Sequence, residues 1–202
     1  DTYDISWGSP DGAVNYDVYM DGALIIERRE ANSAEATGLD TNTVHSFKVV
    51  ARNATEGTSL VSSTVTKYTN AAIPTIEVDS ATTGMIYMSL QNNGNPEDTE
   101  YLLQRSIDGV NYTTLENYTI NSTDEETTPY IDRNLDSGTT YYYRIKARNE
   151  DGVETAYSPV VSRVTLTVAP TGLTVNARTG MAGDLIISWT APKGASSYDV
   201  YR

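Results

Sequence analysis

The chain has 202 residues, 39% of them hydrophobic, and a formal net charge of −13 from 27 acidic and 14 basic side chains. No basic cluster interrupts this balance, so nucleic acid is not an expected partner, because phosphate binding requires a concentrated positive surface. The absence of cysteine excludes disulfides, thiolate catalysis and thiolate metal sites. No apolar run reaches the roughly 18–20 residues of a membrane span. The regularly spaced apolar residues favour a folded chain, and its length allows one large domain or two smaller ones.

Residues 1–72 have the pattern of short strands separated by turns. Tyr3, Ile5 and Trp7 alternate with polar residues, as expected of a half-buried strand. The dipeptide at 21–22 is Asp-Gly, which favours a tight hairpin turn. Residues 24–26 are therefore expected to pair back on the strand that precedes this turn.

The most regular stretch of the chain runs from Leu135 to Ala147. It opens with Leu-x-Ser-Gly-Thr-x-Tyr, in which the Tyr141 ring can pack inward while its hydroxyl reaches backbone across the corner. Alternation then predicts a strand with one buried face. The buried face is expected to hold Tyr141, Tyr143, Ile145 and Ala147, and the other face Tyr142, Arg144, Lys146 and Arg148.

The same pattern occurs earlier in the chain, at 39–51. Strands are expected to follow the two copies at 59–66 and 158–165. The spacing of equivalent residues predicts repeated units of about 96 residues. The pairs Leu39/Leu135, Ala51/Ala147 and Pro74/Pro170 are 96 positions apart, and Trp7/Trp189 and Tyr16/Tyr198 are 182 apart.

These features resemble fibronectin type III domains. The resemblance is carried by Ile-Ser-Trp at 5–7 and 187–189, by the two corner motifs that begin at Leu39 and Leu135, and by the proline-bearing linkers. It implies an all-β fold of tandem fibronectin type III-like antiparallel β-sandwiches. Residues 1–72 would form a domain lacking its first strand, 73–168 a complete domain, and 169–202 the first strands of a third.

Two positions depart from this family pattern. The second unit has Leu90 where the others have Trp7 and Trp189, so its core should be smaller at that point. The first unit has His45 at the position of the corner residue Tyr141, which removes the hydroxyl. An imidazole there is expected to donate a hydrogen bond to a backbone carbonyl instead.

The sequence does not predict an enzyme. His45 is the only histidine, and no zinc pair, P-loop, dinucleotide-binding glycine pattern or Gly-x-Ser-x-Gly motif is present. The acidic clusters at 124–126 and 149–152 could bind calcium weakly or act as an acid/base pair, but solvated turns explain them better. We therefore expect no catalytic residue, cofactor or metal.

Two sets of surface residues suggest contacts with sugar. Four asparagines lie in glycosylation sequences: Asn53, Asn111, Asn117 and Asn121. Three tyrosines could form a sugar-stacking surface in the second unit, although cross-strand packing is the commoner role of such residues. They are Tyr112, Tyr118 and Tyr130.

The sequence favours a non-enzymatic structural spacer and interaction module of an extracellular surface protein, a filament or a phage appendage. Its expected partners are neighbouring repeats or other copies of itself, and its expected place is extracellular, at the cell surface or secreted, with the virion as the alternative. Self-association by strand complementation would place residues 171–177 of one chain on the open edge of another chain's first unit. The blander explanation is a window from a longer array. The alternative functions are a carbohydrate-binding or accessory region of a secreted polysaccharide-degrading enzyme or adhesin, and a receptor-like adhesion protein.

Overall fold

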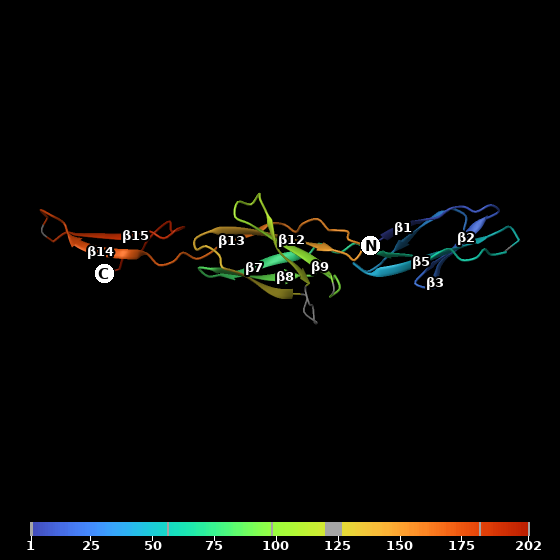
Figure 1. Ribbon diagram of the computed structural model, residues 1–202, viewed down its shortest axis with the longest axis horizontal. Coiled ribbons are helices and arrows are strands. Elements are labelled where there is room, and N and C mark those ends of the chain that lie inside the picture. The colour runs from blue at the N-terminus through green and yellow to red at the C-terminus, as the bar shows by residue number, and fades with distance from the viewer. Residues whose placement is uncertain (1, 56, 98, 120–126, 182, 202) are drawn as a thin grey trace.

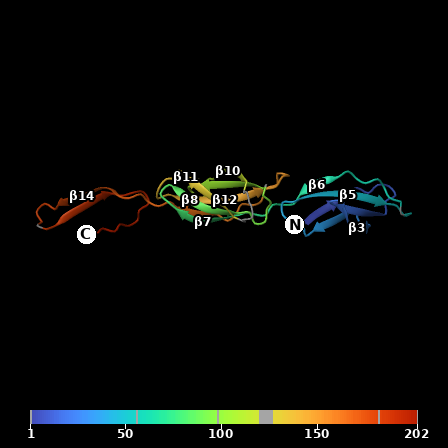
Figure 2. The same cartoon turned by 90° about the horizontal axis from the view of Figure 1, so that it is seen from below.

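A computed structural model describes residues 2–55, 57–97, 99–119, 127–181 and 183–201, with only the backbone described at 116–119 and 127. The described residues form fifteen strands and no helix. Three bodies follow one another along the long axis of the molecule (Figures 1 and 2). We call them the N-terminal unit (residues 2–68), the central sandwich (75–164) and the C-terminal hairpin (171–190).

The central sandwich consists of two antiparallel sheets. In the three-stranded sheet β8 (Met85–Gln91) lies between β11 (Thr127–Arg133) and β7 (Thr75–Ala81). The four-stranded sheet has the order β10-β9-β12-β13, and its strands are Thr113–Thr119, Glu100–Ser106, Thr140–Arg148 and Val161–Val164 in that order. The predicted fold class is confirmed, because the chain is all-β and this 3 + 4 strand order is fibronectin type III-like.

Strand β12 supplies the centre of the core, and the predicted alternation is confirmed. Tyr143, Ile145 and Ala147 are fully buried, whereas the residues between them are half-buried. Ile86 and Leu90 of β8 belong to the same buried cluster. Leu90, which stands where the other two units have tryptophan, therefore lies in the middle of a closed core.

The predicted corner is also present. The backbone N–H of Asp136 donates to the Tyr141 hydroxyl oxygen at 2.9 Å, and the Tyr141 ring is buried. The Leu135 side chain is buried, and its N–H donates to the Gly84 carbonyl at 3.0 Å, which joins the corner to the opposite sheet. The corner thus fixes the start of β12.

The N-terminal unit has a four-stranded sheet with the same arrangement as its counterpart. Its order is β3-β2-β5-β6, formed by Ala23–Arg29, Asn15–Met20, Val44–Arg52 and Val65–Tyr68. Asp21 and Gly22 both have positive φ (50° and 81°), which confirms the predicted tight turn between β2 and β3. The second sheet is a pair, β1 (Thr2–Ser6) with β4 (Ser33–Thr37), so the described residues include no strand equivalent to β7.

The strands predicted at 59–66 and 158–165 are shorter than expected, since β6 and β13 begin at Val65 and Val161. The reason is local, because serine hydroxyls take the place of backbone carbonyls as hydrogen-bond acceptors between the neighbouring strands. The N–H groups of Ala51 and Ile145 donate to the side chains of Ser59 and Ser158 at 2.9 and 3.1 Å. These segments follow their neighbours but do not form regular strand pairs.

The C-terminal hairpin pairs β14 (Thr171–Ala177) with β15 (Leu185–Thr190), and its first strand has the predicted bounds. Every residue of β14 is exposed. The Trp189 and Tyr198 rings meet edge to face at 5.2 Å, as Trp7 and Tyr16 do at 5.4 Å in the N-terminal unit.

Candidate functional sites

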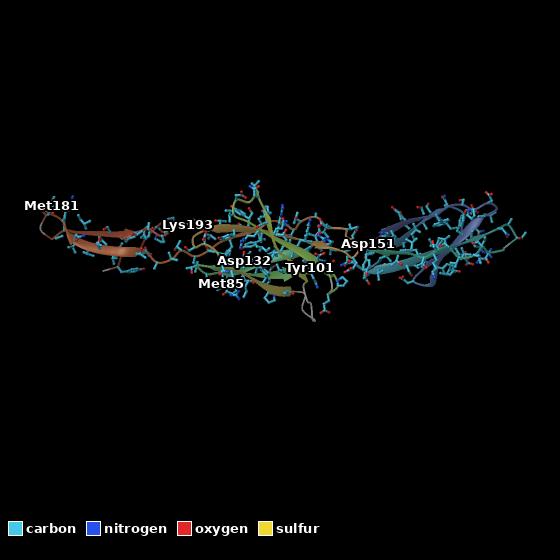
Figure 3. All side chains as sticks on the ribbon, viewed as in Figure 1. Met85, Tyr101, Asp132, Asp151, Met181 and Lys193 are labelled. Atoms are coloured by element: carbon cyan, nitrogen blue, oxygen red, sulfur yellow. The ribbon has the colours of Figure 1, made fainter. Side chains whose placement is uncertain are left out.

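A buried ionic group joins the two sheets of the central sandwich. Asp132 on β11 accepts a hydrogen bond from the Tyr143 hydroxyl at 2.8 Å and two from Arg105 Nη1 on β9 at 2.9 and 3.0 Å. Figure 3 labels Asp132 within the body of the sandwich. Burial, followed by this hydrogen bond, raises the pKa of Tyr143 far above its usual value. The tyrosine therefore stays protonated and acts as a structural donor.

The N-terminal unit has a different ionic group, on its four-stranded sheet. The carboxylate of the buried Asp17 accepts hydrogen bonds from Arg52 Nε at 2.8 Å and from the Arg28 N–H at 3.0 Å. The Arg52 hydrogen bond is the main cause that holds the pKa of Asp17 below its usual value, against the opposing effect of burial. Both buried carboxylates are thus paired and serve the fold.

His45 lies in a chain of three side chains. Its Nδ1 is 2.7 Å from Asp21 Oδ2, and its Nε2 is 3.0 Å from Thr43 Oγ1. The prediction that His45 donates to a backbone carbonyl is wrong, because its imidazole contacts two side chains. The Thr43 hydroxyl also donates to the Asp40 carbonyl at 2.9 Å. This bond uses its proton in the loop, so the arrangement stabilises the corner and does not provide an activated nucleophile.

Tyr112 belongs to a stack of aromatic and cationic side chains on the outer face of the four-stranded sheet. The guanidinium of Arg144 lies 3.9 Å from the centre of the Tyr112 ring and 3.9 Å from the centre of the Tyr157 ring. Its Nε donates to Gln104 Oε1 at 2.9 Å. The stack spans the face of the sheet and occupies one side of each ring.

Of the other two tyrosines of the predicted sugar surface, only Tyr130 has a described side chain, and it lies away from this stack. Tyr130 is on β11, in the other sheet, and packs against the core cluster. The Tyr118 side chain lies outside the described residues. The structure thus places Tyr112 and Tyr130 on different sheets, and glycan contact through these residues stays a prediction.

Of the four asparagines in glycosylation sequences, two have side chains that the structure describes. Asn53 and Asn111 are exposed, and both side chains are hydrogen-bonded in turns: Asn53 Oδ1 accepts from the Gly57 N–H at 2.8 Å, and Asn111 Nδ2 donates to Asp108 Oδ2 at 2.8 Å. The Asn117 side chain, Asn121 and the acidic cluster at 124–126 lie outside the described residues. Glycosylation stays a prediction.

A groove opens beside β1 in the N-terminal unit, where β7 would lie in the central sandwich. Its volume is about 320 Å³, and its apolar lining includes Tyr3, Ile5, Phe47 and Val65. The Tyr3 and Phe47 rings meet edge to face at 5.6 Å on its floor. The groove is therefore an opening into the space between the two sheets.

The described part of the chain has no group of three or more metal-ligating side chains. Within the same part, no helix is long and apolar enough to cross a membrane.

No family model matches the chain, and no curated protein is found as a relative. Among solved structures, the chain is similar to one titled "Central Fibronectin-III array of RIM-binding protein", with 18% identity over 93% of this chain and 73% of that chain, at a TM-score of 0.34. The assignment of the fold rests on the strand order and registers described above.

Proposed function

We propose that this chain is a non-enzymatic structural spacer and interaction module of an extracellular surface protein, a filament or a phage appendage. The observation that carries the proposal is the end-to-end arrangement of the three bodies (Figure 1). A chain built in this way sets a distance between the segments at its two ends.

The linker between the first two bodies supports this function, because hydrogen bonds hold it against the central sandwich. The Ala72 N–H donates to Asn95 Oδ1 at 2.7 Å, and Asn95 Nδ2 donates back to the Ala72 carbonyl at 2.8 Å. Asn93 Nδ2 donates to the Ile73 carbonyl at 2.8 Å. Pro74 adds a fixed φ at the end of the linker.

A domain replacement in the parent protein tests the spacer function. Residues 73–168 are replaced by an unrelated β-sandwich of similar length, and in a second variant by a flexible Gly/Ser segment. We expect the unrelated sandwich to preserve the activity of the parent protein and the flexible segment to reduce it. Loss of activity with both replacements would contradict the proposal and indicate a specific binding surface on the central sandwich.

The interaction module we propose is self-association by strand addition. Leu173 and Val175 of β14 are exposed, and the apolar groove beside β1 lies at the position that β7 has in the central sandwich. The β14 strand of one copy would pair with β1 of a second copy.

Sedimentation of the chain over a range of concentrations tests this association. We expect oligomers that dissociate on dilution and are lost in Leu173→Lys, because a charged side chain cannot enter the apolar groove. The control is Thr174→Lys, on the opposite face of the same strand. A strictly monomeric chain, or equal effects of the two variants, would rule out strand addition.

A further inference from the structure

Polar side chains connect the N-terminal unit to the central sandwich at one end of each body. Asn42, in the corner loop before β5, donates from Nδ2 to Thr99 Oγ1 at 2.6 Å. The hydroxyl of Thr41 donates to the Gly94 carbonyl at 3.2 Å. The corner loop of one body therefore lies against the loop that joins β8 to β9 in the next.

A second pair of segments completes this contact. Asn149, at the end of β12, donates from Nδ2 to the Thr69 carbonyl at 3.1 Å. Asp151 accepts a hydrogen bond from the Tyr68 N–H at 3.0 Å, and its carboxylate is 3.5 Å from Lys67 Nζ. Figure 3 labels Asp151 at the end of the central sandwich that faces the N-terminal unit. We call these contacts, together with the linker, the first interface.

Burial makes the first interface selective for one geometry. Asn42, Thr99 and Asn149 are only 6%, 3% and 4% exposed. A donor buried to this extent is left unsatisfied when its partner moves away and nothing replaces it, which is unfavourable. A bend or a twist between the bodies would break several of these bonds together, unless water entered the interface.

The junction with the C-terminal hairpin uses the equivalent positions in a different way. Gly138 is 96 positions after Asn42, and both have positive φ (56° and 49°). A Cβ on Gly138 would lie 2.0 Å from the Lys193 carbonyl oxygen, and a Cβ on Gly194 would lie 2.6 Å from the Gly138 oxygen. Figure 3 labels Lys193 at this junction. Here the corner loop meets the following body by direct backbone contact.

We propose that the contact between a corner loop and the loop after the second strand of the following body is a fixed joint, which holds successive bodies in one relative orientation. The first joint is held by asparagine side chains, and the second by two glycines that let the backbones touch. The proposal rests on the spacer function and adds its mechanical basis. A spacer with such joints transmits orientation as well as distance.

Double electron–electron resonance, which measures the distance between two spin labels, tests the first joint. The chain has no cysteine, so Glu35→Cys on β4 and Ser162→Cys on β13 give two labelled, exposed sites in different bodies. Labelled chains are diluted with unlabelled chains, which removes distances between copies. We expect one narrow distance peak, and loss of that peak in Asn42→Ala and Asn95→Ala.

Asn111→Ala is the matched control, because Asn111 is bonded within its own turn, away from the joint. We expect it to keep the narrow peak. Protection of β12 amides from hydrogen exchange, measured on every variant, shows that the central sandwich stays folded. A broad distribution in the starting chain, or an unchanged peak in both joint variants, would overturn the proposal.

A second label pair, Ser162→Cys with Asn176→Cys, tests the second joint. Gly138→Ala is expected to shift or broaden the distance peak. Gly109→Ala is its control, since Gly109 also has positive φ but a Cβ there would make only ordinary contacts with the Tyr142 ring. Equal effects of Gly138→Ala and Gly109→Ala would overturn the proposal that the second junction is a fixed joint like the first.

The result of the distance measurements is independent of the domain-replacement test of the spacer function. The labelled chain is studied alone, so a flexible joint can be detected even if the domain replacement supports a spacer. A fixed joint can likewise be found in a protein whose activity depends on a binding surface.

Discussion

The N-terminal unit and the central sandwich have matching four-stranded sheets but different cores. Among its described residues the central sandwich has a cluster of eleven buried residues, which come from both sheets. Among its described residues the N-terminal unit has seven buried hydrophobic residues, three of which, Ala36, Leu39 and Phe47, form one cluster with Tyr3 and Ile5 partly buried against it. The same strand pattern therefore encloses a smaller buried core in the N-terminal unit.

One strand accounts for much of this difference. In the central sandwich β7 places Ile76 and Val78 against the core and covers the edge of β8. In the N-terminal unit the edge of β1 opens onto the apolar groove. A closed core excludes water from both sheets, whereas a groove leaves the side chains on its floor partly wet. We therefore expect equivalent substitutions to cost more in the central sandwich.

The largest expected effect comes from the core itself. Met88→Ala should destabilise the central sandwich by about 3 kcal/mol, because it removes a fully buried side chain and leaves a cavity. Ile5 has the equivalent place in the N-terminal unit, and Ile5→Ala should cost only about 1 kcal/mol there, since this side chain is already half in water. Hydrogen exchange of β12 and β5 amides measures the two bodies separately. Equal losses would show that the groove is closed in solution.

The next effect concerns the buried carboxylate of the N-terminal unit. Asp17→Asn should destabilise this unit by about 2 kcal/mol at pH 7, since the hydrogen bonds from Arg52 and Arg28 lose their charged acceptor. The folded-state pKa of Asp17 is lowered, so its contribution is fully present above the unfolded carboxyl pKa of about 3.9 and is lost as pH falls through the folded-state pKa.

Urea unfolding checks this prediction. In a Trp189→Phe background, Trp7 is the only tryptophan and reports the N-terminal unit. The difference between starting chain and Asp17→Asn should shrink as the pH is lowered below about 4. A difference that does not depend on pH would contradict the assignment of the ion pair.

A smaller effect is expected at the corner. Tyr141→Phe should cost about 1 kcal/mol, because the Asp136 N–H loses its acceptor. Tyr142→Phe, on the opposite face of β12, is the control and should change stability by less than about 0.5 kcal/mol. Urea unfolding followed by circular dichroism compares the two. Equal changes would mean that the corner hydrogen bond contributes nothing to stability.

The smallest effect is expected at the tyrosine–arginine stack. Arg144→Gln should cost about 0.5–1 kcal/mol, since two ring contacts at the surface are lost. Lys48 has the equivalent place on β5 and is exposed, so Lys48→Gln should change stability by less than about 0.5 kcal/mol. Comparison of the unfolding midpoints checks this, and a larger change for Lys48→Gln would contradict it.

Local patterns predicted much of the fold. The alternation around Tyr143, the corner at Tyr141 and the turn at 21–22 each depend on neighbouring residues, and all three were confirmed. Strand lengths were less predictable, because hydroxyls such as that of Ser158 take the place of carbonyls in the ladder. The sequence alone does not show whether a serine within a strand pattern will accept such a hydrogen bond with its hydroxyl.

Contacts between distant residues could not be predicted. Asn42 and Thr99 are 57 positions apart, and the corner motif that contains Asn42 gives no sign of a partner in the next body. Asparagine-rich loops favour turns, so Asn93 and Asn95 give no local sign that they hold a linker. At His45 the missing hydroxyl was evident from the sequence, but its partner Asp21 is 24 positions away, in the turn of a hairpin.

Small-angle X-ray scattering of the monomeric chain, separated by size exclusion at low concentration, tests the central claim most directly. The claim is that the bodies are held end to end by fixed joints. We predict that a single extended arrangement accounts for the scattering, and that Asn42→Ala combined with Asn95→Ala shortens the maximum dimension and requires an ensemble. A starting chain that already requires an ensemble of bent arrangements would contradict the claim.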